Sequence, residues 1–152
     1  MEKVPLCVIG CGGMGHRHIL AHKELEESGI GNIELIAVCD SNPKNADLGK
    51  REVERLFDRT PLVFTDLDKA LAHPDIAAVD VVTDPSVHHQ VAVPALEAGK
   101  HALVEKPLGI TIVSMTSKLE LSGFCRRDQR APAFHARWVH RGFRLVLGLR
   151  HR

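Results

Sequence analysis

Aromatic residues are scarce in this 152-residue chain, which contains no tyrosine, one tryptophan and five phenylalanines. Its core must therefore be mostly aliphatic. No apolar run approaches the roughly 20 residues of a membrane-spanning helix. The apolar part of the N-terminus runs at once into glycines and histidines, which makes a poor signal peptide. We therefore expect a cytoplasmic protein that has no membrane partner.

Cysteine is also rare, and the four cysteines, which show no CxxC spacing, are Cys7, Cys11, Cys39 and Cys125. This pattern indicates reduced thiols, not a disulfide framework or a zinc site. Histidine is more abundant, with ten residues. His18 and His22 are spaced i, i+4 and could face one metal ion. Because no acid or cysteine completes a set in the sequence pattern, we expect solvated or core-edge histidines and no metal site.

Charge divides the chain into two parts. Residues 1–122 contain 12 Lys and Arg against 18 Asp and Glu, whereas residues 123–152 contain eight Arg, no Lys and one acid. We therefore predict one domain over 1–122 and a basic tail over 123–152. The lysine-free tail is typical of an out-of-frame reading of GC-rich DNA, so the favoured interpretation is a frameshifted or truncated product whose tail is disordered.

Two alternatives for the tail stay open. It could be an arm that binds nucleic acid through its charge, although a nucleic-acid partner is disfavoured because no RNA-binding fold is indicated. It could also contribute the sequence FRLVLGL, residues 143–149, as a sixth strand at the edge of a sheet.

Short apolar runs alternate with helical patterns between residues 4 and 122. We expect strands at 4–10, 33–40, 62–64, 77–83 and 101–107, and helices at 14–28, 42–57, 66–74, 85–99 and 110–123. Apolar strands that alternate with helices predict a doubly wound parallel α/β sheet of the Rossmann type. Such sheets bind ligands at the carboxyl ends of their strands, where the sequence places Gly10, Asp40, Thr83 and Glu105.

The most conspicuous local pattern is IGCGGMGHRH at residues 9–18. Gly10, Gly12 and Gly15 match G-x-G-x-x-G between a strand and a helix, which is the context of a dinucleotide-binding loop. Gly10 would permit the turn, Gly12 would let the backbone approach a pyrophosphate, and Gly15 would let the helix pack closely on the sheet. The alternative is a glycine-rich turn that binds nothing.

Asp40 ends the second expected strand, 25 residues after Gly15. An acid near this distance accepts hydrogen bonds from the adenosine ribose hydroxyls and repels a 2′-phosphate. The predicted cofactor is therefore NAD, with NADP as the alternative because Lys44 can moderate the repulsion. In a second interpretation, Asp40 only caps the next helix.

Three segments carry a family resemblance: VIGCGGMGHRHI, the acid Asp40, and VVTDPSVHHQVAVPALEAGKHALVEKPLGIT. Over about residues 4–112 the chain resembles the N-terminal domain of the Gfo/Idh/MocA oxidoreductases, and its most specific element is AGKHALVEKPL at 98–108. The resemblance implies an NAD(P)-dependent oxidoreductase that transfers a hydride between the nicotinamide and the hydroxyl-bearing carbon of a sugar, a polyol or a related compound.

The resemblance also implies roles for individual residues. The pyrophosphate loop is Gly10, Gly12, Gly13, Met14 and Gly15, Asp40 holds the adenosine ribose, and the cofactor cleft continues through Thr83, Asp84 and His88. The family's EKP motif is Glu105, Lys106 and Pro107, and its proline often follows a cis peptide. Lys106 is the predicted catalytic residue, although a lysine before a turn proline is otherwise a plain surface residue. The family usually has proline where this chain has Asp84.

The family places its substrate pocket and a second catalytic histidine in a following α+β domain of about 150–200 residues. Only about 40 residues follow the EKP motif here. We therefore expect little or no turnover from this chain alone. The alternative from another functional class is a non-catalytic nucleotide-binding module.

Overall fold

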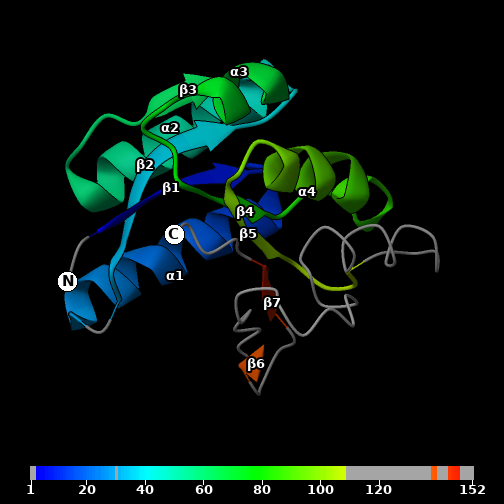
Figure 1. Ribbon diagram of the computed structural model, residues 1–152. Coiled ribbons are helices and arrows are strands. Elements are labelled where there is room, and N and C mark those ends of the chain that lie inside the picture. The colour runs from blue at the N-terminus through cyan, green and yellow to red at the C-terminus, as the bar shows by residue number, and fades with distance from the viewer. Residues whose placement is uncertain (1–2, 30, 109–137, 140–143, 148–152) are drawn as a thin grey trace.

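The structure is a computed structural model that describes residues 3–29, 31–108, 138–139 and 144–147 (Figure 1). The strands are β1 (Val4–Ile9), β2 (Ile33–Cys39), β3 (Leu62–Phe64), β4 (Ala78–Val81), β5 (His101–Val104), β6 (Trp138–Val139) and β7 (Arg144–Leu147). The helices are α1 (Gly13–Ser28), α2 (Pro43–Phe57), α3 (Leu67–Ala72), the 3₁₀ turn η1 (Pro85–Val87) and α4 (His88–Glu97).

The strands form one sheet in the order β3-β2-β1-β4-β5-β7-β6. The first five strands in this order pair in parallel. The chain moves outward from β1 through β2 to β3, and then returns to place β4 on the other side of β1. The strand order therefore reverses between β1 and β4, and open α/β sheets bind ligands at the carboxyl ends of their strands at such a point.

Helices cover the central strands on both faces of the sheet, and alternate residues of each strand point to opposite sides. On one face Leu6 and Val8 pack in a cluster with Ile19 of α1 and Val53 of α2. The opposite face packs against residues of α3 and α4 in a second cluster, which includes Cys7 and Ile9. Figure 1 shows the strands running between α1 and α4. The predicted doubly wound α/β fold is confirmed.

The expected elements between residues 4 and 104 are present, with one revision. The helix expected over 85–99 begins instead as η1, and α4 starts only at His88. Asp84 causes this, because its side chain accepts the backbone N–H of Ser86 and holds a tight 3₁₀ turn. Gly99 follows the end of α4 with φ +74°, as expected of a terminating glycine.

The expected helix 110–123, the proposed domain boundary at 122 and most of the basic tail lie outside the described residues. Within the tail, β7 pairs antiparallel with β5, and β6 pairs antiparallel with β7. β7 falls inside the segment 143–149, where a strand was one of the interpretations, but it lies between β5 and β6 and not at the edge of the sheet. The frameshift and nucleic-acid interpretations of the tail stay predictions.

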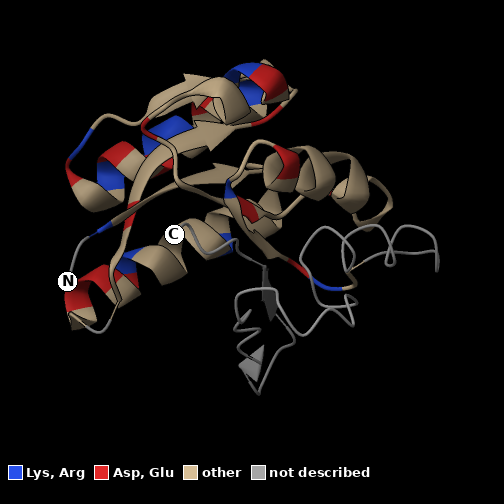
Figure 2. Cartoon of the chain, in the orientation of Figure 1, with Lys and Arg blue, Asp and Glu red and all other residues tan. Residues whose placement is uncertain are grey.

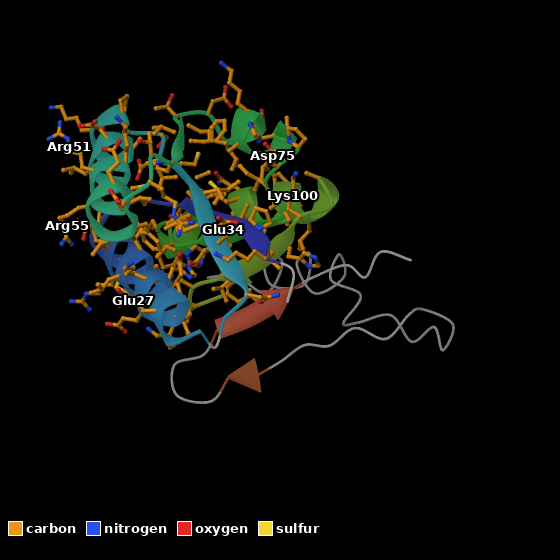
Figure 3. All side chains as sticks on the ribbon, turned by 90° about the vertical axis from the view of Figure 1, so that its left-hand side faces the viewer. Glu27, Glu34, Arg51, Arg55, Asp75 and Lys100 are labelled. Carbon is orange, nitrogen blue, oxygen red and sulfur yellow. The ribbon has the colours of Figure 1, made fainter. Side chains whose placement is uncertain are left out.

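Charged residues gather on α1, α2 and α3, whereas α4 has Glu97 as its one charged residue (Figure 2). On α2, Arg51 and Arg55 point away from the sheet (Figure 3) and pair with Asp47 and Glu52 along the same helix at 2.6 Å. The hydrogen bonds from Arg55 hold the pKa of the Glu52 carboxyl below its usual range. These solvent-facing pairs contribute little stability, so the helices are held mainly by their apolar faces.

Candidate functional site

The glycine-rich loop connects β1 to α1, and its glycines are required for different reasons. Gly10 has φ +98°, and a Cβ there would lie 2.7 Å from the carbonyl oxygen of Val82. A Cβ on Gly15 would lie 2.1 Å from the carbonyl oxygen of Gly10. Both glycines are therefore needed by the fold. A Cβ on Gly12 would meet no atom within 4 Å, so the folded chain does not itself require glycine there.

The N-terminus of α1 is open. Asn42, Asp66 and Asp84 cap α2, α3 and η1 with side-chain hydrogen bonds. By contrast, in the part of the chain that the structure describes, α1 begins at its N-cap Gly12 with no side-chain cap and no acid in its first turn. Free N–H groups and a partial positive charge at a helix start favour an anion.

A cleft of about 540 Å³ lies at the carboxyl ends of β1, β2 and β4, within the usual volume of small-molecule sites. Five of the predicted site residues line it: Gly10, Gly12, Asp40, Thr83 and Asp84. The lining also contains four polar residues that no sequence motif marks: Ser41, Asn45, Thr65 and Gln90. Ser41 and Thr65 come just after β2 and β3, so the rule that ligands bind at strand ends was the available signal.

Asp40 has a structural role that its spacing did not reveal. Its Oδ2 accepts the backbone N–H of Cys11 at 2.8 Å, which fixes the glycine loop to the end of β2. Its Oδ1 accepts the N–H of Asn42 at 2.9 Å. The interpretation of Asp40 as the helix cap is wrong, because Asn42 caps α2 by accepting the N–H of Lys44 at 3.0 Å. Asp40 lines the cleft while it anchors the loop.

Asp84 stands at the other end of the cleft, where the family usually has proline. Its Oδ1 accepts the hydroxyl of Ser86 at 2.5 Å and the backbone N–H of Ser86 at 2.9 Å. These two hydrogen bonds hold the pKa of the Asp84 carboxyl below its usual range. Asp40 and Asp84 are thus two acids in the cleft, and the described lining contains no Lys, Arg or His.

His88 begins α4, but it does not line the cleft. It is fully buried, with Nε2 2.9 Å from the carbonyl oxygen of Thr83 and Nδ1 2.9 Å from that of Pro107. The expectation that its side chain lines the cleft is corrected, because the ring lies between the loop after β4 and the turn after β5. His88 therefore positions the EKP turn beside the cleft.

The EKP turn follows β5, and none of its three residues lines the cleft. The peptide between Lys106 and Pro107 is cis, as the resemblance suggested. The side chain of Lys106 is 62% exposed, and its Nζ lies 3.8 Å from Oε1 of Glu105, which is 14% exposed. Lys106 thus lies outside the lining and follows β5, which pairs with β4, one of the strands whose ends form the cleft.

Gly13 and Met14 are also outside the lining. A Cβ on Gly13 would meet no atom within 4 Å, and Met14 is 43% exposed in the first turn of α1. Their predicted cofactor role stays a prediction.

The two histidines of α1 are not solvated or at the edge of the core. His18 and His22 are 1% and 5% exposed, and both contact Oδ2 of the fully buried Asp80. The distances are 2.8 Å from His18 Nδ1 and 2.8 Å from His22 Nε2. An acid therefore does accompany this pair. The overlooked signal was a charged residue inside the apolar strand AAVDVV. No group suited to a metal ion occurs among the described residues.

Three cysteines of the described part are free, buried thiols: Cys7, Cys11 and Cys39. Burial, with Asp40 nearby, raises the pKa of the Cys11 thiol to about 12 and that of Cys39 to about 11. They are therefore poor nucleophiles. Cys125 lies outside the described residues.

None of the described helices is long and apolar enough to cross a membrane.

A family model described as "Oxidoreductase family, NAD-binding Rossmann fold" matches residues 5–122. Among curated proteins, the alpha-N-acetylgalactosaminidase of Shewanella oneidensis is 32% identical over 116 residues, which are 74% of this chain and 24% of that protein. A glycosyl hydrolase family 109 protein of Shewanella sp. strain MR-4 is 34% identical over 119 residues, with the same coverages. The chain spans about a quarter of the length of these relatives.

Solved dehydrogenases share the fold. The WlbA dehydrogenase of Chromobacterium violaceum, solved with NADH and UDP-GlcNAcA, has a TM-score of 0.68 and 26% identity, covering 82% of this chain and 33% of that one. A levoglucosan dehydrogenase solved with NADH and L-sorbose has a TM-score of 0.67 and 27% identity, and the match covers 80% of this chain and 32% of that one. The scyllo-inositol dehydrogenase of Lactobacillus casei has a TM-score of 0.65 and 28% identity, and the match covers 81% of this chain and 34% of that one.

Proposed function

Since the chain belongs to the Gfo/Idh/MocA oxidoreductase family and carries its NAD-binding Rossmann domain, we propose that it is the cofactor-holding part of an enzyme that acts on a sugar or polyol hydroxyl. The uncapped start of α1 is the observation that carries this proposal, because it opens at Gly12 into the cleft. The pyrophosphate binds to the N–H groups of this first turn, and no Cβ on Gly12 stands in its way.

Asp40 holds the adenosine ribose and makes NAD the preferred cofactor. Its carboxylate accepts hydrogen bonds from the ribose hydroxyls, while a 2′-phosphate would meet a negative charge. No cation in the described lining offsets that charge. Arginine is the usual partner of a 2′-phosphate in such sites, so the lining supports NAD over NADP.

Thr83 and the EKP turn, which His88 joins through their carbonyl oxygens, would hold the nicotinamide end of the cofactor. When bound, the nicotinamide accepts or returns a hydride. Lys106 donates a hydrogen bond to the substrate oxygen and stabilises the charge that develops as the hydroxyl loses its proton. Glu105 lies 3.8 Å from the ammonium and keeps it at the rim.

Lys106 is too exposed to complete a reaction site by itself. With 62% of its side chain in solvent, the wall that excludes water from a hydride transfer must come from residues beyond the described part, or from another chain. We therefore propose that this chain binds NAD but turns over little or no polyol without such a wall.

A second candidate is a part in glycoside hydrolysis. The curated alpha-N-acetylgalactosaminidase and family 109 proteins are 30–34% identical to this chain, against 26–28% for the dehydrogenases of known structure. Both candidates retain a sugar-type substrate and the same cleft. The buried free thiols Cys7, Cys11 and Cys39 favour a reducing compartment such as the cytoplasm for either one.

Calorimetric titration with NAD and with NADP tests the proposal. Asp40→Asn should weaken NAD binding about tenfold through the loss of charge-assisted hydrogen bonds, and NADP binding should weaken less. If the substitution only loosened the loop, the binding of NAD and of NADP would weaken alike, because both cofactors contain the same pyrophosphate. Asp47→Asn makes the same change on the exposed face of α2 and should alter neither affinity. The proposal fails if the native chain binds neither cofactor at millimolar concentration.

A further inference from the structure

The hydroxyl of Thr83 is buried and has no hydrogen-bond partner among the described residues. Thr83 also lines the cleft, two residues after the end of β4. A buried hydroxyl that the fold leaves unpaired costs stability, and native proteins satisfy most groups of this kind. The position of this hydroxyl in the wall of a cleft therefore points to a ligand group as its partner.

Backbone contacts hold Thr83 beside the glycine-rich loop. Its carbonyl oxygen lies 2.9 Å from Nε2 of the buried His88. On the other side, the N–H of Val82 donates to the carbonyl oxygen of Ile9 at 2.8 Å. A Cβ on Gly10 would lie only 3.0 Å from the backbone nitrogen of Thr83. The main chain of Thr83 is thus fixed against the start of the loop, and its side chain is the part that remains free to adjust.

The alternation along β4 places this side chain on the same side of the sheet as the apolar wall of the cleft. Val81 belongs to the cluster that packs against α3 and α4, whereas Val82 belongs to the opposite one. Because successive side chains alternate between the two faces, Thr83 falls on the side of Val81. The cleft residues Leu67 and Val91 pack in or against that same cluster. Rotation about χ1 exchanges the hydroxyl and methyl positions of a threonine, so the hydroxyl can turn toward a ligand there.

The strand order indicates which part of the cofactor each strand end meets. Neighbours in the sheet run β2, β1, β4 and β5, and they are followed by Asp40, the glycine loop, Thr83 and the EKP turn, respectively. A nicotinamide dinucleotide has a matching order: adenosine ribose, pyrophosphate, second ribose and nicotinamide. With the adenosine ribose at Asp40 and the pyrophosphate at Gly12, the next strand end, ~4.8 Å farther along the sheet, meets the second ribose. Its hydroxyls donate and accept hydrogen bonds, as a threonine hydroxyl does.

We propose that the Thr83 hydroxyl binds the ribose on the nicotinamide side, so that the cleft selects adenosine diphosphate carrying a second sugar over adenosine diphosphate alone. This inference rests on the proposed NAD site. The selectivity arises because the second ribose satisfies a hydroxyl that the folded chain leaves unpaired, whereas ADP leaves it unpaired. Stability and affinity therefore oppose each other at this residue, since the same hydroxyl weakens the fold and strengthens binding.

Calorimetric titration of the full chain with NAD, ADP-ribose and ADP tests the inference. Thr83→Val keeps the shape of the side chain and removes its hydroxyl. It should weaken the binding of NAD and of ADP-ribose roughly five- to tenfold, as expected for the loss of one hydrogen bond, and should leave the affinity for ADP unchanged. Its midpoint of urea unfolding should stay the same or rise, because the hydroxyl has no partner in the fold to lose. Thr83→Ser retains the hydroxyl and should bind all three ligands almost as the native chain does.

Thr60→Val is the matched control, since the Thr60 hydroxyl is exposed and donates to Glu54 outside the cleft. This variant should alter none of the three affinities. An equal loss of ADP affinity in Thr83→Val would place the Thr83 hydroxyl against the pyrophosphate or the adenosine, which overturns the inference. A lower urea midpoint in Thr83→Val, with Thr83→Ser unchanged, would show that the hydroxyl stabilises the fold and would overturn the inference as well.

The same titrations separate this inference from the proposed function. If the native chain binds NAD and Thr83→Val binds it equally well, the inference fails and the proposed function stands. If the native chain binds neither NAD nor ADP-ribose at millimolar concentration, the proposed function fails and the inference with it. If Thr83→Val does not fold, Thr83→Ala, which also lacks the hydroxyl, decides by the same comparison.

Discussion

Alanine at two glycines of the loop should separate folding from cofactor binding. In Gly15→Ala, the new Cβ would lie 2.1 Å from the carbonyl oxygen of Gly10. The atom in its way is backbone, so α1 must shift, and α1 carries the buried Ile19 into the core. Overpacking of this kind costs about 1–3 kcal/mol. We expect a loss of about 3 kcal/mol in the free energy of unfolding.

Gly12→Ala should do the opposite. Its Cβ meets no protein atom, and Gly12 has φ −73°, which alanine adopts without strain. Stability should be unchanged or should rise by up to about 1 kcal/mol, because alanine restricts the unfolded chain. The methyl group would occupy the space proposed for the pyrophosphate, however, and hydrogen bonds to a charged group are worth about 1.5–3 kcal/mol. NAD affinity should therefore fall roughly 10–100-fold.

Urea unfolding and NAD calorimetry on the same preparations measure both effects. Gly31→Ala is the control, because its Cβ would make only an ordinary contact of 3.6 Å with Leu25, away from the cleft. It should change neither quantity by much. If Gly12→Ala binds NAD as tightly as the native chain, the pyrophosphate does not lie against Gly12 and the reasoning is refuted. A loss of stability in Gly12→Ala equal to that in Gly15→Ala would refute it as well.

Three further outcomes follow from the packing. Arg59 contacts Glu26 and Glu34 and lies over the ring of Phe57, so Arg59→Met should cost about 0.5–1 kcal/mol of unfolding free energy in urea, a difference that shrinks in about 1 M NaCl. In a Cys125→Ser variant, the buried thiols of Cys7, Cys11 and Cys39 should resist a thiol reagent at neutral pH and should react once the chain is unfolded. Rapid labelling of the folded variant would contradict their burial. Because the folded pKa of Asp80 is lowered, its contribution is present above the unfolded value of about 3.9 and is lost as the pH falls through the folded value. As the pH falls, the free energy of unfolding should therefore decrease more steeply for the native chain than for Asp80→Asn. If the two variants lose stability in parallel, the Asp80 carboxylate does not contribute in this way.

Strong local patterns made the fold predictable from the sequence. The five parallel strands are apolar runs that helices cover on both faces, and Gly10, Pro43 and Gly99 mark real turns and helix ends. The start of α4 was missed because the side chain of Asp84 bonds to Ser86 and favours a 3₁₀ turn over a continuous helix.

The site was less predictable, because contacts between distant segments determine it. Spacing identified Asp40, but it could not show that this carboxylate holds the N–H of Cys11, 29 residues away. The same limit applies to Asp80 and His18, which are 62 residues apart in the chain and 2.8 Å apart in the fold. Only the strand register and the face of α1 bring such pairs together.

His88 joins two loops by contacting backbone carbonyl oxygens alone, those of Thr83 and Pro107. Such a joint does not depend on which side chains the two loops carry. The loop after β4 can therefore exchange proline for Asp84, and the rim around Lys106 can acquire new neighbours, without moving one loop relative to the other. For protein engineering, this makes His88 the residue to keep fixed while cofactor preference and substrate recognition are varied independently on either side of it.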